Sequence, residues 1–319
     1  MRLGRFLVRR VALGVLTLLL VSIVVFAATQ ALPGNAAIAI LGRNATPARV
    51  AALTRQLHLN RSVVSQYFHW LGGIVSGNLG TSAATQQSVS SLISGRIANS
   101  AFLVLVSAVV AIPLSIVLGV LMAVRRDRPT DHILSIGFLA LASLPDFVIG
   151  IALALLLATN LSHVFPAVSL IPPGEHAWNV PNAVVLPAAT LVLAVTPYIS
   201  RIMRASMIEV LESDYVTMAR LKGLSNRTVI WRHAVPNAIV PAIQVTALQL
   251  AYMAGGVVLV EYVFSFPGIG AQLVDAVGNR DVPVVQALAV IIAAVYVVVN
   301  LIADLVTILV TPRLRTAGR

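Results

Sequence analysis

Few residues in this sequence have the type and spacing needed for chemistry. Lys222 is the only lysine among 22 basic residues, and the chain contains no cysteine. The six histidines are scattered, with no H-E-x-x-H zinc motif among them. A nucleotide-binding P-loop needs a lysine followed by Ser or Thr, whereas Lys222 is followed by Gly223. We therefore predict no catalytic residue, no metal site and no cofactor held by this chain.

Two acidic residues, Asp146 and Asp304, lie well inside apolar stretches. A charge at the centre of a bilayer costs roughly 2.5–3.5 kcal/mol on insertion scales, so such residues are kept for function or are paired. Asp146 follows Pro145, and it either faces a water-filled pathway or caps a helix that restarts after the proline. For Asp304 we expect a neighbouring arginine as partner. Two isolated acidic residues give little support for a proton relay, which a proton-coupled transporter would need.

The elements that must position these residues are long apolar runs. The chain is 58% hydrophobic and only 10% charged, whereas soluble domains carry about 25% charged residues. A run of roughly 20 apolar residues spans a membrane as a helix. Six such runs occur, at residues 8–30, 99–124, 133–160, 182–200, 237–260 and 284–310. The sequence thus predicts an all-α integral membrane protein with six transmembrane helices.

The fourth run is the weakest candidate. It is short and contains Pro187 and Pro197. Membrane helices tolerate proline where neighbouring helices or water satisfy the freed backbone groups. We therefore expect this span to be kinked and packed inside the bundle.

Basic residues predict the orientation. Sixteen lie in the N-terminal arm, the loops after the second and fourth runs, and the tail, and six lie on the opposite side. By the positive-inside rule, both termini are cytoplasmic. The apolar run 11–28 exceeds the ~7–15 residues of a signal-peptide core, so we expect an uncleaved first span. The net charge of +11 is then explained by arginines that flank spans, and no nucleic-acid partner is expected.

These predictions divide the chain into four parts. Residues 1–30 form a cytoplasmic arm and the first span, and 31–98 an external segment. Within that segment, 47–57 and 63–75 have the pattern of short amphipathic helices, and 72–94 are rich in Gly and Ser. Residues 99–310 form a five-helix core that includes a cytoplasmic loop at 206–236, and 311–319 form a tail.

The loop 206–236 is too polar to span and too regular for a slack linker. Acidic residues precede a helical stretch at 215–221 that ends in basic residues, which suits the helix dipole. Gly223 can then cap that helix, and Ser225 or Asn226 can cap the next. With Pro236 at the start of the fifth span, we predict two short helices at an angle below the membrane. From the pattern alone, the loop is either a docking element or a surface loop held by lipid headgroups.

Specific residues in this loop carry a family resemblance. Asp214-Tyr215 leads into Ala219-Arg220-Leu221-Lys222-Gly223-Leu224, and Pro236 stands thirteen residues after the glycine. Thr217-Met218-Ala219 occupies the place of a usual Glu-Ala-Ala. The stretch resembles the coupling loop of ABC importer permeases. It is most similar to the B-type permeases of dipeptide, oligopeptide and nickel importers.

Other motifs resemble the same family in order and spacing along nearly the whole chain. They are Leu32-Pro33-Gly34, Gly77-Asn78-Leu79-Gly80, Ser143-Leu144-Pro145, Glu261-Tyr262-Val263-Phe264, Pro267-Gly268-Ile269-Gly270, Arg280-Asp281 and Pro312-Arg313. This chain departs from the pattern at four positions. Asn35 and Asn78 replace aspartates, Thr311 replaces another, and Asp146 stands where a small or uncharged residue is common.

The resemblance implies a type I importer architecture in a bacterial plasma (inner) membrane. Two related permeases form a pathway, two ATPases below them bind ATP and Mg, and an extracytoplasmic binding protein lies above. The implied ATPase-coupling residues are Asp214, Tyr215, Thr217, Ala219, Arg220, Lys222, Gly223, Leu224 and Pro236. The expected pathway residues are Asp146, Gln249, Gly255, Gly256 and Glu261. The paired glycines allow close helix approach or a kink, and simple packing is expected.

The resemblance favours peptide import. Nickel, glutathione and other small solutes use similar permeases and remain alternatives. A channel or secondary transporter that works alone is the alternative from another class. A membrane-bound enzyme has no catalytic constellation to support it.

Overall fold

Long apolar helices dominate the molecule. The computed structural model describes residues 3–31, 46–56, 62–160, 165–172 and 174–310. Within these residues, five helices are long and apolar enough to cross a membrane, and one bent pair provides a sixth candidate. The five are α1 (Leu3–Gln30), α5 (Val89–Val124), α8 (Pro181–Leu211), α11 (Val235–Val263) and α13 (Val282–Val310). The predicted all-α membrane fold is confirmed. The tail 311–319 and the motif residues 32–35 lie outside the described residues.

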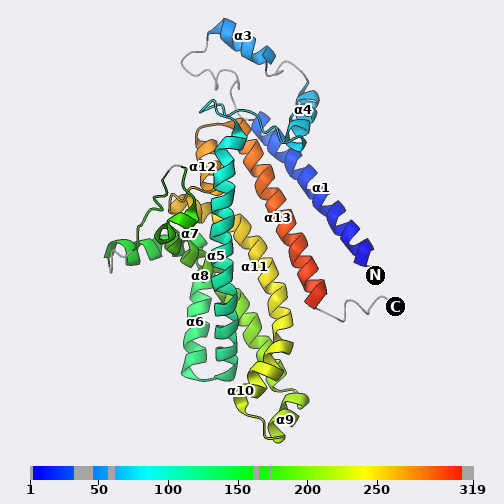
Figure 1. Cartoon of the computed structure of the whole chain (residues 1–319), viewed down its shortest axis with the longest axis vertical. Coiled ribbons are helices and arrows are strands. Elements are labelled where there is room, and N and C mark those ends of the chain that lie inside the picture. Colours follow the sequence, from blue (N-terminus) through cyan, green and yellow to red (C-terminus); the bar gives the residue numbers. More distant parts are fainter. Residues whose placement is uncertain (1–2, 32–45, 57–61, 161–164, 173, 311–319) are drawn as a thin grey trace.

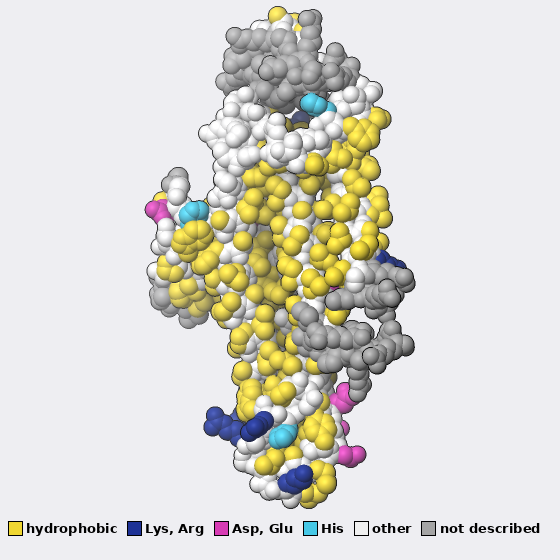
Figure 2. Space-filling model, turned by 45° about the vertical axis from the view of Figure 1, so that its right-hand side comes forward, with side chains coloured by type: hydrophobic (Ala, Val, Ile, Leu, Met, Phe, Trp, Pro, Cys, Tyr) yellow, Lys and Arg dark blue, Asp and Glu magenta, His cyan; other side chains and the backbone are white. Residues whose placement is uncertain are grey.

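The bundle is assembled around α8, which packs against α5 and α11. On the other side of α11 lies α13, and α1 runs antiparallel beside α13 (Figure 1). Arg10 of α1 forms an ion pair with Asp304 of α13, with 2.9 Å between Nη1 and Oδ2. This pair confirms the arginine partner expected for Asp304. Figure 2 shows hydrophobic side chains over the length of the bundle, with basic side chains gathered mainly at one end.

The predicted span 133–160 is not one straight helix. It consists of α6 (Pro129–Ser143) and α7 (Asp146–Leu153), which are bent by 110° and continue into a π-helical segment, Ala154–Asn160. Leu144 is extended, with φ −95° and ψ 137°. A proline disfavours the helical conformation of the residue before it and lacks an N–H of its own. Pro145 therefore breaks the span, and α7 starts directly after the proline.

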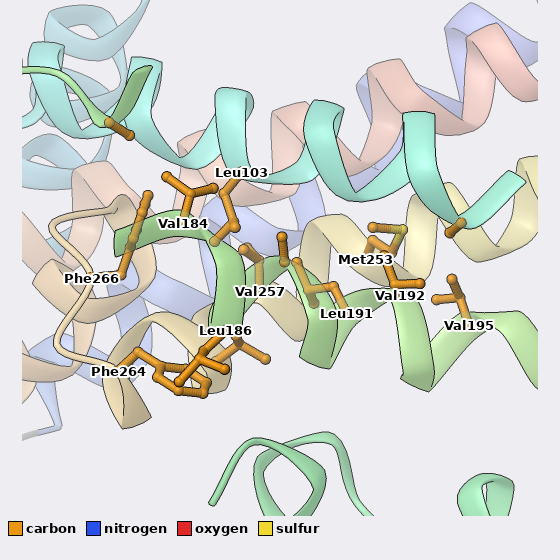
Figure 3. Packing of buried hydrophobic residues seen from close by; sticks show 14 residues of the cluster. Leu103, Val184, Leu186, Leu191, Val192, Val195, Met253, Val257, Phe264 and Phe266 are labelled. Atoms are coloured by element: carbon orange, nitrogen blue, oxygen red, sulfur yellow. The ribbon is translucent and has the colours of Figure 1, made fainter. Parts of the chain in front are cut away.

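The fourth predicted span, which is the weakest candidate in the sequence, is the most buried of the five long helices. In its most apolar window α8 is 78% buried, whereas the corresponding window of α1 is 11% buried. As expected, α8 packs inside the bundle, but it continues as one helix through Pro187 and Pro197 to Leu211. Its side chains Leu191, Val192 and Val195 interlock with residues of α5 and α11 in the core shown in Figure 3. The sequence does not predict that α8 extends beyond residue 200, because arginines interrupt the apolar pattern there.

The external segment contains the two predicted short helices, α3 (Pro47–Gln56) and α4 (Val63–Val75). The rings of Tyr67 and Trp70 on α4 lie 5.5 and 5.4 Å from the Phe26 ring of α1. The Tyr67 hydroxyl is also 2.8 Å from Ser22 Oγ. These contacts hold α4 against the outer end of α1. The predicted Gly- and Ser-rich loop is shorter than expected, because Ser88 caps α5 at Val89.

A further short helix, α12 (Ile269–Gly278), connects α11 to α13 on the same outer side. The Asp281 carboxylate, just before α13, accepts hydrogen bonds from Ser82 Oγ and from the backbone N–H of Ala83 at 2.9 Å. The turn at 81–88 is thereby fastened to the α12–α13 junction. Two external segments far apart in the sequence form one connected surface.

Candidate functional site

The cytoplasmic loop contains a short amphipathic helix, α9 (Asp214–Leu221). Its inner face is formed by Val216 and Ala219, which are buried against Val229 and the end of α8. Asp214 lies in its first turn and Arg220 in its last, and both suit the helix dipole. A small apolar cluster therefore fixes α9 to the end of the bundle.

Gly223 ends α9 in the way the sequence predicted. Its φ is +78°, a left-handed conformation that L side chains rarely adopt. The N–H of Gly223 donates to the carbonyl of Arg220 at 2.9 Å, and the N–H of Leu224 donates to that of Ala219 at 3.4 Å. These two bonds form a Schellman motif. The chain then turns sharply, and Ser225 Oγ accepts from the N–H of Thr228, which caps the next helix.

The second predicted short helix is not separate. The segment α10 (Asn226–Thr228) passes through a π-helical turn, Val229–Ala234, directly into α11. Pro236 lies in the first turn of α11, directly after the π-helical turn, and the helical run is not interrupted there. The structure thus has one short helix, α9, beside the elongated base of α11.

The outer face of α9 exposes large apolar side chains. Tyr215 is 45% exposed, Met218 55%, Leu221 77% and Leu224 40%. We call these four residues the α9 apolar face. All of the predicted coupling residues are exposed except Ala219, which points into the protein. Sequence reasoning missed Met218 and Leu221 as site residues, although Tyr215, Met218 and Leu221 follow one another at intervals of three and so lie on one side of a helix.

Ion pairs tie the base of α9 to the α5–α6 connection. Glu212, at the end of α8, accepts from Arg126 Nη1 at 2.5 Å. Deeper in the bundle, Arg204 of α8 binds both oxygens of Asp131 in α6. The end of α8 is thus joined by ion pairs to the α5–α6 connection and to α6.

A groove of about 410 Å³ lies along α11 and α13. Its lining residues are Leu248, Gln249, Ala251, Tyr252, Gly255, Gly256 and Tyr296. Three of the five predicted pathway residues, Gln249, Gly255 and Gly256, come together there. The neighbouring Tyr252 and Tyr296 were not predicted, and only the packing of α11 against α13 brings Tyr296 to the groove.

Asp146 lies beside this groove, in the first turn of α7. Its carboxylate accepts from the Tyr252 hydroxyl at 3.1 and 3.3 Å. A Cβ placed on Gly256 would lie 3.0 Å from Asp146 Oδ2, so this glycine allows α7 to approach α11 closely. The N-cap position of α7 is Pro145, which makes no side-chain cap. The Asp146 carboxylate therefore contacts Tyr252 of α11.

Glu261 does not line the groove. Its side chain is fully buried, and it accepts hydrogen bonds from Ser100 Oγ at 2.5 Å and from the N–H of Gly270 at 2.7 Å. Ser100 Oγ accepts in turn from the N–H of Ile269. These bonds fasten the start of α12 to α5 and α11, and the pathway role of Glu261 stays a prediction.

Comparison with known proteins identifies the family. Residues 115–316 match the model of the binding-protein-dependent transport system inner membrane component, and residues 3–104 match its N-terminal model. The chain belongs to this family of ABC transporter permeases. It is accordingly a multi-pass inner-membrane protein, and members of the family are generally non-catalytic membrane components that act with ATPase and substrate-binding partners.

Relatives match over nearly their whole length. A probable peptide ABC transporter permease protein of Sinorhizobium fredii is 35% identical over 98% of this chain and 99% of its own. A putative peptide transport system permease protein of Brucella abortus is 33% identical over 97% and 98%. A glutathione transport system permease protein of Salmonella choleraesuis is 32% identical over 94% and 95%.

Proposed function

We propose that this chain is the permease subunit of an ABC importer for peptides. It would form half of the pathway, with a second related permease supplying the other half. The similarity to permeases named for peptide transport, over 97–98% of this chain, supports the substrate class. The family membership supports the reaction class.

The observation that carries the proposal is the α9 apolar face. Its exposed side chains lie on a helix whose opposite face is held by Val216 and Ala219. A soluble surface of this kind is a partner-binding site, and here the partner is a separate ATPase. Two such ATPases would bind ATP and Mg, since Lys222 has no P-loop context.

Closure of the ATPases on ATP would push α9 and shift the bundle between inward- and outward-facing states. The ion pair between Arg126 and Glu212 would carry the movement from the end of α8 to the α5–α6 connection. The groove along α11 would then open alternately to the two sides, with Gln249, Gly255 and Gly256 at its wall.

The same arrangement supports an orientation in the membrane. The first turn of α1 and the last turn of α13 point toward the end of the bundle where α9 lies (Figure 1). We place both termini in the cytoplasm. The opposite end, formed by α4, the turn at 81–88 and α12, would receive an extracytoplasmic binding protein. A pocket of about 230 Å³ beside the start of α12, lined by Arg96 and Asp275 among others, lies on that side.

The test is reconstitution of the chain with its partner permease, ATPases and binding protein in proteoliposomes. We expect uptake of a labelled tripeptide that requires ATP. The double variant Met218→Glu/Leu221→Glu should abolish ATPase co-purification and uptake, because it places two charges on the docking face. Arg128→Glu on the exposed α5–α6 connection changes the net charge by the same amount and should leave ATPase co-purification unaffected.

Three other outcomes would contradict or change the proposal. Peptide uptake that persists without ATP or the ATPases would contradict the proposal and favour a channel or secondary transporter. ATP-dependent uptake of Ni²⁺ without peptide uptake would retain the permease and replace the substrate. A double variant that still co-purifies with the ATPase would show that α9 is not the docking element.

A further inference from the structure

The groove along α11 has the chemistry of a site for a cation. Its polar lining groups are the Gln249 amide and the rings and hydroxyls of Tyr252 and Tyr296. The remaining lining residues are Leu248, Ala251 and two glycines. The Asp146 carboxylate adjoins this wall through the Tyr252 hydroxyl and the Cα of Gly256. A carboxylate, two aromatic rings and an amide oxygen all favour positive charge.

Asp146 differs from other acids of the bundle in its partners. Asp131 is bound by Arg204, and Asp304 by Arg10. Over the described ranges, Asp146 is in no ion pair, and the Tyr252 hydroxyl is its side-chain donor. A carboxylate has about four acceptor positions. It therefore retains acceptor capacity for a charged donor brought by a ligand.

The depth of Asp146 in the bundle makes an unpaired charge costly. From Pro129, the 15 residues of α6 rise about 22 Å to the break before Asp146. This rise is shorter than the ~30 Å hydrocarbon thickness, so Asp146 lies part-way along the sixth candidate span. Ionisable residues at such depth generally line substrate pathways when no side chain of the protein pairs with them.

We propose that Asp146 and the groove formed by Gln249, Tyr252 and Tyr296 bind a basic side chain of the peptide substrate during its passage. This rests on the proposed peptide-import function and adds a preference for basic peptides. An ammonium or guanidinium group suits the site better than a metal ion. A search of the described residues finds no group of three His, Cys, Asp or Glu side chains that could hold a metal.

The volume of the groove and its open wall fit a site that binds the substrate briefly during transport. Its volume of about 410 Å³ accommodates a side chain with part of its backbone and lies in the range of small-ligand pockets. Gly255 has no atom within 4 Å of an added Cβ, so one wall is open. A single carboxylate with aromatic neighbours holds a cation weakly enough to release it, which passage requires.

The test measures a ratio within one set of vesicles. Proteoliposomes with the complete transporter receive Ala-Lys-Ala and Ala-(Nε-acetyl-Lys)-Ala together, with different labels, at concentrations that saturate the binding protein. Asp146→Asn should lower the ratio of lysine to acetyl-lysine peptide uptake about tenfold, the effect of losing one charge-assisted contact. Asp146→Glu should keep the ratio. Asp127→Asn, at an exposed position where asparagine suits the backbone, is the matched control.

A second variant keeps the proposal testable if Asp146→Asn does not fold. Gly255→Lys adds a tethered ammonium where the groove is open, and it should lower uptake of the lysine peptide more than uptake of the acetyl-lysine peptide. An unchanged ratio in both variants would overturn the proposal, as would an equal fall in uptake of both peptides. If the unmodified transporter takes up neither peptide with ATP, the proposed function fails instead.

Discussion

Asp131 and Arg204 form a two-point ion pair that joins the first turn of α6 to the cytoplasmic part of α8. The Arg204 Nε and Nη2 groups donate to the two carboxylate oxygens at 2.7 and 2.6 Å. Asp131 also accepts from the N–H of Asp127 at 3.2 Å. The residue is almost fully buried. The pair therefore clamps the broken span to the most buried helix, close to α9.

Removal of one partner of this pair should destabilise the protein. Asp131→Asn leaves the partly exposed Arg204 without its counter-charge, and we expect a loss of about 1–3 kcal/mol in the free energy of unfolding. Thermal unfolding of the purified chain in detergent measures the change. Asp127→Asn, whose side chain is 77% exposed, should cost less than about 0.5 kcal/mol. A double variant Asp131→Asn/Arg204→Gln should lose less than the sum of the single losses. Additive losses would show that the two groups do not interact.

Gly119 sets the distance between α5 and α8. A Cβ there would lie 2.6 Å from Met203 Cβ and 2.7 Å from the Ser200 carbonyl oxygen. Neither atom is the end of a flexible side chain, so Gly119→Ala must push the helices apart. We expect about 1–3 kcal/mol of destabilisation, measured by thermal unfolding. Gly137→Ala on α6 has nothing within 4 Å of the new Cβ and should be neutral or stabilising. Equal stability of both variants would contradict the close packing.

Gly223 is needed for its backbone conformation. Its added Cβ would meet no atom within 4 Å, so the cost of substitution arises from φ +78° alone. Gly223→Val should impair ATPase co-purification because the turn after α9 is lost. Gly223→Asn should retain most of it, since asparagine tolerates the left-handed region. The check is the amount of ATPase retained per permease on an affinity column. A valine variant that binds as well as the asparagine variant would refute the conformational explanation.

Glu261 holds the start of α12. In Glu261→Gln one oxygen becomes an NH₂ group, which cannot accept the hydrogen bond from Ser100 Oγ or those from the N–H groups of Gly270 and Ala271 that the replaced oxygen accepts. We expect about 1–3 kcal/mol of destabilisation and faster hydrogen exchange at the α12 amides. Mass spectrometry of exchanged peptides measures this. Glu175→Gln on the exposed external loop should leave exchange at α12 unchanged. Slow exchange in the Glu261 variant would show that the carboxylate is dispensable.

The sequence by itself determined the membrane class and the outline of the bundle. Six apolar runs of about 20 residues in a chain with only 10% charged residues indicate membrane spans, and this depends on composition rather than on neighbours. Local chemistry likewise predicted the cap at Gly223, because only glycine readily adopts that conformation. The break after Ser143 was partly visible in Pro145, but its 110° angle depends on how α7 packs against α8 and α11.

Tertiary structure alone decided which residues share a site. The sequence could not separate buried Glu261 from groove-lining Gln249, because both lie on α11 and burial depends on the helices packed against each face. It also could not bring Tyr296 to the groove or place Asp146 against Tyr252, since these contacts join helices far apart in the chain. Ala219 and Met218 are neighbours on α9, yet one is buried and the other exposed. The fold makes that distinction because only one side of a helix can face the core.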